Sequence, residues 1–222
     1  MPRRKQHRPP KDVFLIIVDG QTEKWYLEMM KESLSFPRIN IKPELPKKKE
    51  LHQIEKVITR QKNDYVKVIW LVDYDEIRHN HQERKFQDIQ QKLTKFENVE
   101  ILTNNPCLEF WFLLHFCETS KLFQNCKKAE NTLKKYLKDY KKTEAYFKNH
   151  RENIYKKLKP HKSKAIQRAR KLDSNEPFED KLAKAQIYKL FDILGIIYQF
   201  PSFPLQNIPS ESYHQNALSE IA

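Results

Sequence analysis

Acidic side chains follow two strongly apolar runs of the sequence and could hold a metal ion. Asp19 comes directly after residues 13–18 (VFLIIV), and Asp73 and Asp75 come directly after residues 66–72 (VKVIWLV). Both runs predict buried parallel strands, and ligands of parallel sheets bind beyond the carboxyl ends of the strands. Because carboxylates are preferred ligands of Mg²⁺ and Mn²⁺, we expect these three acids to form a divalent-metal site.

The spacing of the acids adds geometric expectations. Asp73 and Asp75 are two positions apart, so an extended backbone would place both carboxylates on one side, roughly 6–7 Å apart. Glu23 follows Asp19 by four residues, where the first turn of a helix could face the same space, and Glu76 continues the acidic cluster. The structural alternative is that Asp19 and Asp73 cap helices and that Asp75 is solvated.

Alternating apolar runs and amphipathic segments predict the elements that position these acids. Strand–helix alternation of this kind is typical of an α/β fold with a parallel sheet flanked by helices. The expected strands are 13–18, 66–72 and 99–102, with a short strand within 37–45. The expected helices are 23–33, capped by Thr22, then 50–62, 82–96 and a buried helix over 108–116, with Pro106 near its first turn.

The C-terminal half has a different character. Residues 121–172 are Lys-rich with a helical pattern, residues 173–177 form a polar break, and residues 181–198 predict a last amphipathic helix. The expected organisation is a basic disordered tail over 1–11, an α/β domain over 12–118, a basic helical extension packed on it over 119–200, and an irregular tail over 201–222.

Positive charge is concentrated in two segments. The chain has 42 Lys and Arg residues against 29 acids, a net charge of +13, and residues 1–11 contribute +5. Residues 121–170 hold 17 Lys and Arg residues against four acids, so the remainder of the chain sums to −5. Clustered cations favour a polyanion, although a solvated lysine-rich surface is the alternative. The candidate nucleic-acid-binding residues are Lys127, Lys128, Lys134, Lys135, Lys141, Lys142, Arg168 and Arg170.

Composition excludes several classes of protein. The two glycines, Gly20 and Gly195, can form neither a Walker loop nor a GxGxxG loop. No apolar run approaches the ~18 residues of a membrane-spanning helix, and the basic start lacks the apolar core of a secretory signal. Cys107, Cys117 and Cys126 form no CxxC pair, so we expect neither a disulfide nor a Cys-rich zinc site, and a reducing cytoplasmic location.

Several other residues admit two interpretations. His79 and His81 follow the acids on a polar loop, where solvation is favoured over a catalytic role, and His115 is expected to be a hydrogen-bonded core histidine. Glu109 lies among apolar residues and needs a partner, which is either the metal site or a buried Lys or Arg. Four tyrosines among the lysines could stack on bases or belong to the core: Tyr136, Tyr140, Tyr146 and Tyr155.

Five segments carry a resemblance to known families. Residues 18–23 (VDGQTE) resemble the V-E-G-x-T-E signature of TOPRIM domains in overcoming-lysogeny-defect nucleases, and residues 70–76 (WLVDYDE) resemble the TOPRIM D-x-D strand end. Residues 105–116 (NPCLEFWFLLHF) closely resemble the N-P-C-F-E-L-W-L-L-L-H-F block of the RloB-like family. Residues 133–142 and 165–170 are similar to that family's downstream blocks, so the resemblance covers about residues 11–195.

The resemblance implies a TOPRIM fold and a metal-dependent role at nucleic-acid phosphodiesters. It also implies phage defence by abortive infection, typically beside an AAA-type ATPase. By position, Asp19 matches the family glutamate, Asp73 and Asp75 match D-x-D, and Glu109 matches the glutamate of the Asn-Pro block. This chain departs from the family pattern in two ways. Asp19 is one methylene shorter than the family glutamate, and the turn that follows it is one residue shorter than the usual RloB-like turn, E-G-x-x-T-E.

We therefore expect a Mg²⁺- or Mn²⁺-dependent nuclease that hydrolyses DNA or RNA, possibly tRNA. Its expected catalytic residues are Asp19, Glu23, Asp73, Asp75 and Glu109, and the first four would hold the metal. The alternative is a catalytically weak or inactive module of the same fold that binds nucleic acid or a partner. A primase or topoisomerase fragment is disfavoured because the chain is small and offers no nucleophilic tyrosine context.

Overall fold

The computed structural model describes most of the chain and leaves the expected tails aside. Described are residues 13–34, 40–44, 50–173 and 182–195, with the backbone alone for 40–44. The expected tails over 1–11 and 201–222, and most of the polar break over 173–177, lie outside the described residues.

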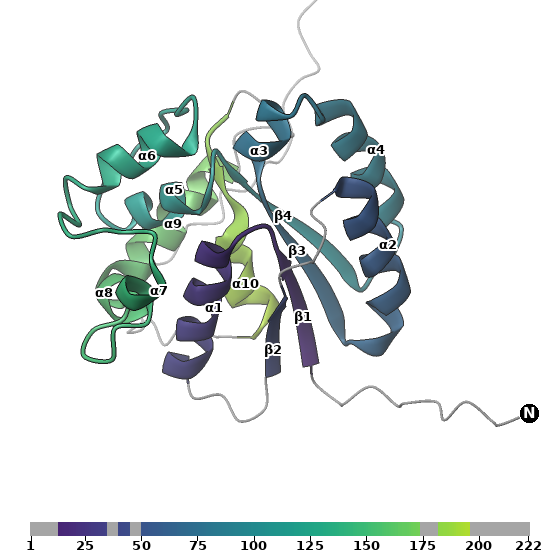
Figure 1. The fold of residues 1–222 in the computed structure, drawn as a ribbon, viewed down its shortest axis with the longest axis horizontal. Coiled ribbons are helices and arrows are strands. Elements are labelled where there is room, and N and C mark those ends of the chain that lie inside the picture. The colour runs from purple at the N-terminus through teal and green to yellow at the C-terminus, as the bar shows by residue number, and fades with distance from the viewer. Residues whose placement is uncertain (1–12, 35–39, 45–49, 174–181, 196–222) are drawn as a thin grey trace, which may run out of the picture.

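Four parallel strands form the centre of the fold (Figure 1). They are β1 (Val13–Val18), β2 (Asn40–Glu44), β3 (Lys67–Asp73) and β4 (Val99–Asn105). With the short antiparallel strand β5 (Lys184–Ala185), the sheet order is β2-β1-β3-β4-β5. β1 and β3 are apolar along nearly their whole length because helices cover both faces of the sheet. The predicted α/β fold with a parallel sheet is therefore confirmed.

The direction in which strands are added reverses between β1 and β3. From β1 the chain first adds β2 on one side, then crosses back to add β3 and β4 on the other side. Such a reversal opens a crevice at the carboxyl ends of the two central strands, which is where doubly wound sheets bind ligands. Asp19 follows β1 and Asp73 ends β3, so the topology places both acids at this crevice.

Two helices and a short third one cover one face of the sheet. They are α2 (Leu51–Gln61), α3 (Tyr74–His79) and α4 (Glu83–Leu93), at the right and top of Figure 1. α2 and α4 each present apolar residues at helical spacing to a core that includes Trp70 of β3. Edge-on packing of Trp70 against Phe86, with ring centroids 5.5 Å apart, joins α4 to the sheet.

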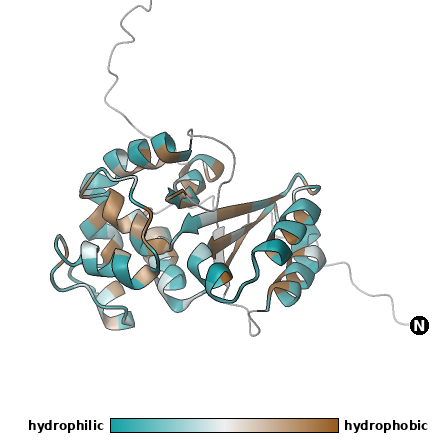
Figure 2. Ribbon diagram, turned by 90° about the horizontal axis from the view of Figure 1, so that it is seen from above, coloured by the Kyte–Doolittle hydropathy of each residue, from teal (hydrophilic) through white to brown (hydrophobic). Residues whose placement is uncertain are grey.

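The opposite face is covered by α1 (Gln21–Leu34), α5 (Leu108–Leu114) and the basic C-terminal segment. All seven residues of α5 are buried. Figure 2 shows the resulting arrangement from above, with hydrophobic strands between two helical layers whose outer surfaces are hydrophilic. One continuous core links α1 and α5 to residues as late as Leu194, so the basic segment shares its core with the sheet.

The basic segment, which was expected to be helical over 121–172, consists of several short helices separated by turns and loops. The helices are α6 (Cys126–Leu133), α7 (Glu144–Phe147), α8 (Ile154–Leu158) and α9 (Lys162–Asp173), with the short 3₁₀ turn η2 (Lys159–His161) before α9. Asn125, Thr143 and Asn153 cap α6, α7 and α8 with their side chains. These capping residues interrupt the lysine-rich pattern because they favour helix starts over helix interiors.

Two further expectations about local structure are wrong. In place of a single helix starting at 181, the chain forms β5 (Lys184–Ala185), η3 (Gln186–Tyr188) and α10 (Lys189–Ile193). β5 pairs antiparallel with the end of β4, because Asn104 and Asn105 offer it a free edge. Thr22 does not cap a helix that begins at 23, because α1 already begins at Gln21.

The remaining elements follow the expectations closely. The strand expected within 37–45 is β2, and the expected helices over 50–62, 82–96 and 108–116 are α2, α4 and α5 with slightly shorter bounds. The Asn105–Pro106 peptide that precedes α5 is cis. Within the described part of the chain, every helix falls short of the length and apolar character that crossing a membrane requires.

Candidate functional site

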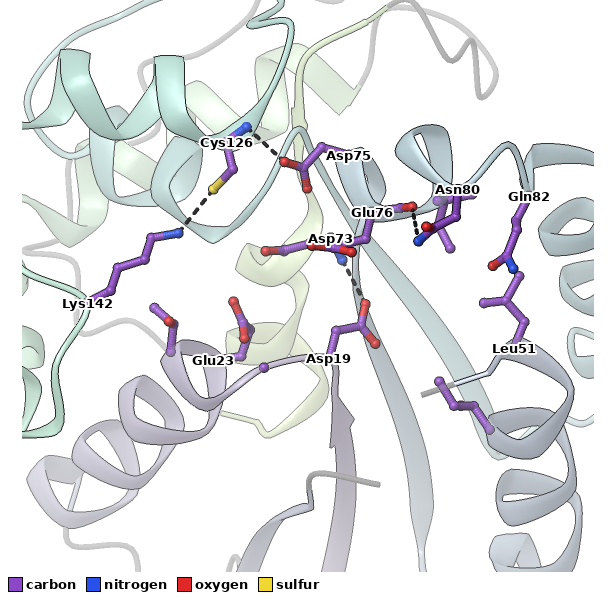
Figure 3. A pocket seen from close by; sticks show the side chains of 14 residues that line it. Asp19, Glu23, Leu51, Asp73, Asp75, Glu76, Asn80, Gln82, Cys126 and Lys142 are labelled. Atoms are coloured by element: carbon purple, nitrogen blue, oxygen red, sulfur yellow. Dashed lines mark hydrogen bonds between the residues drawn. The ribbon is translucent and has the colours of Figure 1, made fainter. Parts of the chain in front are cut away.

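A pocket of about 280 Å³ opens at the carboxyl ends of β1 and β3. Figure 3 shows Asp19 and Glu23 on one side of it, Asp73, Asp75 and Glu76 facing them, and Lys142 approaching from a third direction. The lining residues are Asp19, Gly20, Thr22, Glu23, Leu51, Ile54, Asp73, Asp75, Glu76, Ile77, Asn80, Gln82, Cys126 and Lys142. Four of the five expected catalytic acids thus share one pocket.

Asp19 and Asp73 are fixed to each other and to the sheet. The Asp73 backbone N–H donates to Asp19 Oδ2 (3.1 Å), and Trp70 Nε1 donates to Asp19 Oδ1 (3.3 Å). Asp73 Oδ2 accepts from the Leu108 backbone N–H (3.3 Å), and its Oδ1 accepts from Asn104 Nδ2 (3.4 Å). Three neighbouring elements, β1, β3 and β4–α5, therefore set the positions of these two carboxylates.

The absence of a side chain at Gly20 leaves room for the Glu23 carboxylate. A methyl group on residue 20 would lie 2.5 Å from Glu23 Oε2, closer than two such atoms can approach. Glu23 lies in the first turn of α1 and is buried, so its side chain folds back over the turn that follows β1. The glycine thus serves close approach and leaves room for a carboxylate beside Asp19.

We expect Gly20→Ala to weaken metal binding with little effect on folding. The added methyl group displaces the flexible end of Glu23 and no backbone atom, so the free energy of unfolding should change by less than about 1 kcal/mol. Manganese affinity, measured by calorimetry, should fall about ten-fold, as when a group that orients a ligand is lost. Gln21→Ala, at an exposed neighbouring position, is the control, and equal affinities for the two variants would contradict this role of Gly20.

Asp75 reaches the pocket by a different route from the one expected. The strand ends at Asp73 and helix α3 begins at Tyr74, so Asp73 and Asp75 do not lie on one side of an extended strand. The Asp75 carboxylate accepts from the Cys126 backbone N–H (2.8 Å), which ties α3 to the start of α6. The expectation of extended geometry is wrong because buried Tyr74 turns the chain into a helix directly after the strand.

Glu109 takes the second of the two roles left open for it, pairing with a lysine. Its side chain is 1% exposed, and Oε1 lies 2.8 Å from Lys142 Nζ and accepts a 2.7 Å hydrogen bond from the Tyr140 hydroxyl. Glu109 does not line the pocket, but its charge contributes to the raised pKa of Glu23 and of Asp73. It therefore lies directly behind the pocket and supports one of its walls.

A disulfide joins Cys107 to Cys126, contrary to the expectation that the cysteines are unpaired. It connects the residue before α5 to the first residue of α6, 19 positions later. The widely spaced cysteines gave no signal of pairing, because their proximity results from the packing of α6 on α5. Cys117 is a free, partly buried thiol.

Negative charge dominates the electrostatics of the pocket. Burial, followed by repulsion from Glu109 and Asp19, raises the pKa of Glu23 to about 7. Burial and the neighbouring carboxylates, Glu23 first, raise the pKa of Asp73 well above its usual range. Burial also raises the pKa of Asp75, despite the Cys126 N–H that favours its charged form. Ionising all of these carboxylates together is unfavourable, because they are buried and repel one another, and a bound divalent cation would offset this electrostatic cost.

We expect Glu23→Gln to stabilise the metal-free protein at pH 8. The folded-state pKa of Glu23 exceeds its ordinary value of 4.5, so its contribution to stability is present below pH 4.5 and is lost as pH rises through about 7. Removing this buried charge should raise the free energy of unfolding at pH 8 by on the order of 2 kcal/mol, since one pKa unit corresponds to about 1.4 kcal/mol.

Chemical unfolding in a chelating buffer at pH 5 and pH 8 measures this effect. The wild type should lose stability between the two pH values, and Glu23→Gln should lose distinctly less. A variant that is less stable than the wild type at pH 8 would contradict the assignment of Glu23 as an uncompensated buried acid. Addition of Mn²⁺ at pH 8 should stabilise the wild type more than the variant.

The expected nucleic-acid-binding cations are spread over the basic segment, and Lys142 is the one among them that lines the pocket. Lys127 and Lys134 pair with Glu130, and Lys128 bonds to Gln124. The two arginines have internal partners: Arg168 donates to the Leu114 carbonyl (2.7 Å) and Arg170 pairs with Asp192 (2.7 Å). Lys135 and Lys141 are exposed.

The other ambiguous residues are placed as follows. His115 is buried, its Nδ1 lies 2.9 Å from the Trp111 carbonyl oxygen, and burial lowers its pKa to about 3, so it is the expected core histidine. His79 and His81 are exposed and outside the pocket lining. Tyr140 and Tyr155 are buried and Tyr146 is partly buried, while Tyr136 is 47% exposed and stacks on Phe116.

Some residues of the site escaped the sequence analysis. Asn104 and Trp70 orient the two central acids, and Tyr140 holds Glu109. Asn104 lies on β4 beside Asp73 on β3, a register that a single sequence does not reveal. Lys142 was expected on a nucleic-acid surface, and nothing in its lysine-rich neighbourhood distinguishes it from Lys141.

The donor set suits a hard divalent cation. Asp19, Glu23, Asp73 and Asp75 offer carboxylate oxygens on one pocket, and such oxygens are the ligands that Mg²⁺ and Mn²⁺ accept. Burial, and after it repulsion between the acids, raises the pKa of Glu23 and of Asp73, and a cation among these carboxylates would favour their charged forms.

Comparison with known proteins identifies one family. A family model described as RloB-like protein matches residues 14–194. No curated protein and no solved structure matches the chain significantly. The matched segment runs from β1 to the end of the described core and includes the acids of the pocket and the Asn-Pro block around Glu109. Since the match covers most of the 222 residues, the chain belongs to the family of RloB-like proteins.

Proposed function

We propose that this protein is a Mg²⁺- or Mn²⁺-dependent nuclease that hydrolyses phosphodiester bonds of nucleic acid. The observation that carries the proposal is the convergence of Asp19, Glu23, Asp73 and Asp75 on one pocket at the reversal point of the sheet. Because acids outnumber the single lysine in the pocket lining, the pocket repels an anionic substrate unless a cation neutralises the carboxylates.

The residues of the pocket suit different tasks in such a reaction. A divalent cation supplies charge stabilisation to a reacting phosphate. Asp73, at the centre of the cluster, and Asp19 would hold it. Glu23, whose carboxylate lies in the same pocket, would help to hold the cation or take a proton from an attacking water. Lys142 lines the same pocket and would bind a non-bridging phosphate oxygen with its ammonium group.

The resemblance to TOPRIM nucleases extends the proposal to its biological setting. The acids occupy the strand ends that carry the TOPRIM signatures, Asp19 after β1 and Asp73 at the end of β3, which supports a TOPRIM-type arrangement. We propose a role in phage defence by abortive infection, together with an AAA-type ATPase. The absence of any Walker or GxGxxG sequence in this chain supports assigning nucleotide hydrolysis to a partner.

A binding module without catalysis is the second candidate, and one observation favours it. Asp19 is shorter than the glutamate of the related signatures, and both of its oxygens accept hydrogen bonds from Trp70 and the Asp73 backbone. These bonds give Asp19 a structural role in joining β1 to β3. A carboxylate oxygen can accept more than one partner, so the structural role and metal binding are compatible.

The nuclease proposal is tested by incubating the purified protein with labelled DNA, total RNA and tRNA in Mn²⁺, in Mg²⁺ and in a chelator, with and without the ATPase partner. We expect cleavage of at least one substrate that depends on the added metal and is lost in the chelator. Cleavage that persists in the chelator would contradict the metal dependence. Binding without cleavage under every condition would establish the second candidate instead.

A further inference from the structure

The two disulfide-bonded cysteines lie next to Asp75 and have no role in the nuclease proposal, so Asp75 is shared between that carboxylate cluster and a second group. The sulfurs of Cys107 and Cys126 and one oxygen of Asp75 all lie within 4.8 Å of one another. The Cys126 backbone N–H also donates to Asp75, so the first residue of α6 fixes the carboxylate beside its own sulfur. Three potential ligands from three elements therefore converge: the turn before α5, the start of α6, and α3.

A fourth donor completes this group from the buried side. Glu109 Oε2 lies 3.0 Å from the Cys107 sulfur and 2.8 Å from the Cys126 sulfur. Disulfide sulfurs carry no proton, so neither contact is a hydrogen bond in the oxidised pair. A carboxylate oxygen so close to two sulfurs is better accommodated when the sulfurs are thiols that donate to it, or thiolates that share a cation with it.

The group is accessible to small reagents from one side. Cys126 is partly exposed and lines the pocket, whereas Cys107 is fully buried. A thiol reductant can therefore attack the Cys126 sulfur from the pocket, with Cys107 as the leaving thiolate. The Lys142 ammonium lies 3.3 Å from the Cys126 sulfur and 2.8 Å from Glu109 Oε1. A cation that entered the pocket would therefore displace this ammonium to reach the Cys126 sulfur and Asp75, with Cys107 and Glu109 behind them.

We propose that Cys107, Cys126, Asp75 and Glu109 form a second, redox-gated metal site that binds a thiophilic divalent cation of the Zn²⁺ class once the disulfide is reduced. In the first step, two low-molecular-weight thiols reduce the disulfide and leave two cysteine thiols and one external disulfide. In the second step, the cation displaces the two thiol protons to water and binds the two thiolates. Reoxidation by a low-molecular-weight disulfide, which takes up two electrons and two protons and is cleaved to two thiols, re-forms the Cys107–Cys126 bond and releases the cation.

Ligand chemistry and geometry distinguish this site from the carboxylate cluster. Thiolates select zinc over magnesium, so the two sites prefer different ions. The Cα atoms of Cys107 and Cys126 are 5.6 Å apart, which allows side-chain rotation alone to separate the sulfurs to the ~3.8 Å of a tetrahedral site with Zn–S bonds of about 2.3 Å. Two thiolates with two carboxylates then give the four ligands of such a site.

Cobalt(II) is the probe that tests the proposal, because its thiolate complexes absorb light and the readout does not involve nuclease activity. The wild type is reduced, freed of reductant without oxygen, and titrated with Co²⁺. We expect a sulfur-to-cobalt charge-transfer band that saturates at one equivalent in the reduced protein and is absent from the oxidised protein. No band in the reduced protein, or equal bands in both forms, would overturn the proposal.

Comparing the cobalt charge-transfer band between variants identifies the residues that bind the cation. Cys126→Ser should abolish the band, and Asp75→Asn should weaken cobalt affinity by about ten-fold or more. The matched control is Cys117→Ser, which removes the free cysteine and should leave the band unchanged. Asp73→Asn, which removes the proposed nuclease centre, should retain the band, so the two proposals can fail separately. Loss of the band in Asp73→Asn would place the ion in the carboxylate cluster and overturn the inference.

A measurement on the wild type alone guards against variants that fail to fold. In the reduced protein, Zn²⁺ should slow alkylation of Cys126 by at least ten-fold and leave the rate at Cys117 unchanged, as measured by mass spectrometry of the labelled peptides. Equal protection of the two cysteines, or no protection of Cys126, would contradict the proposed site.

Discussion

Replacing Asp73 by asparagine is expected to lower the rate of metal-dependent cleavage by about a thousand-fold or more, an effect of the size seen when one preorganised electrostatic group is removed from an active site. Asp73 is a buried acid of the pocket lining, and burial, followed by the charges of Glu23, Glu109, Asp19 and Asp75, raises its pKa. The substitution keeps the size of the side chain and removes its charge.

The measurement is the initial rate of cleavage of a labelled oligonucleotide in Mn²⁺, with binding followed separately by fluorescence anisotropy. Binding should remain within a few-fold of the wild type, since the expected phosphate-binding lysines are untouched. Asp88→Asn, an exposed acid on α4, controls for the loss of one negative charge. A rate for Asp73→Asn within ten-fold of the wild type would refute a central role for this carboxylate.

Removing the lysine that faces the acids is expected to have the second large effect, on the stability of the fold. Lys142 lies 2.8 Å from buried Glu109, and the nearby charges of Glu109 and Asp73 raise its pKa although burial alone would lower it. Lys142→Met keeps the aliphatic stem and leaves Glu109 without its cation. Breaking a fully buried pair costs about 3–5 kcal/mol, and exposed pairs contribute at most about 1 kcal/mol.

Lys142 falls between these limits because its side chain is 38% exposed and that of Glu109 is 1% exposed. We therefore expect Lys142→Met to lower the free energy of unfolding by about 2 kcal/mol at pH 7.5 without metal. Urea unfolding measures the loss, and Lys141→Met, at the exposed neighbouring position, should change stability by less than about 0.5 kcal/mol.

A double-mutant cycle isolates the pair from other effects. Glu109→Gln combined with Lys142→Met removes both charges, so the double variant should be more stable than the sum of the two single losses predicts. Strict additivity would show that Glu109 and Lys142 do not stabilise each other. In that case Lys142 would contribute to the pocket without stabilising the buried Glu109.

The sequence predicted the sheet, and the edge of it at which the acids lie, because both depend on local patterns. Continuous apolar runs identified β1 and β3 before any pairing was known, and the acids that follow them lie at the same edge of the sheet. Expectations failed where tertiary contacts override local preference. Buried Tyr74 starts a helix between Asp73 and Asp75, and pairing with the end of β4 draws residues 184–185 into the sheet.

The partners of the acids were the least predictable part of the site. Lys142 is one lysine in a lysine-rich segment, and its pairing with Glu109 results from the fold of the loop between α6 and α7. The disulfide likewise depends on α6 packing beside α5, since 19 residues separate its cysteines. Residue types and spacing indicate which side chains could do chemistry, but long-range packing decides which of them meet.

The most direct test of the carboxylate site is a crystal soaked in Mn²⁺ and measured at the manganese absorption edge. We expect an anomalous peak in the pocket, within about 2.5 Å of a carboxylate oxygen of Asp73 and of at least one of Asp19 and Glu23. The peak should vanish in Asp73→Asn. A pocket without anomalous density in the wild type, at a manganese concentration that supports cleavage, would contradict the account.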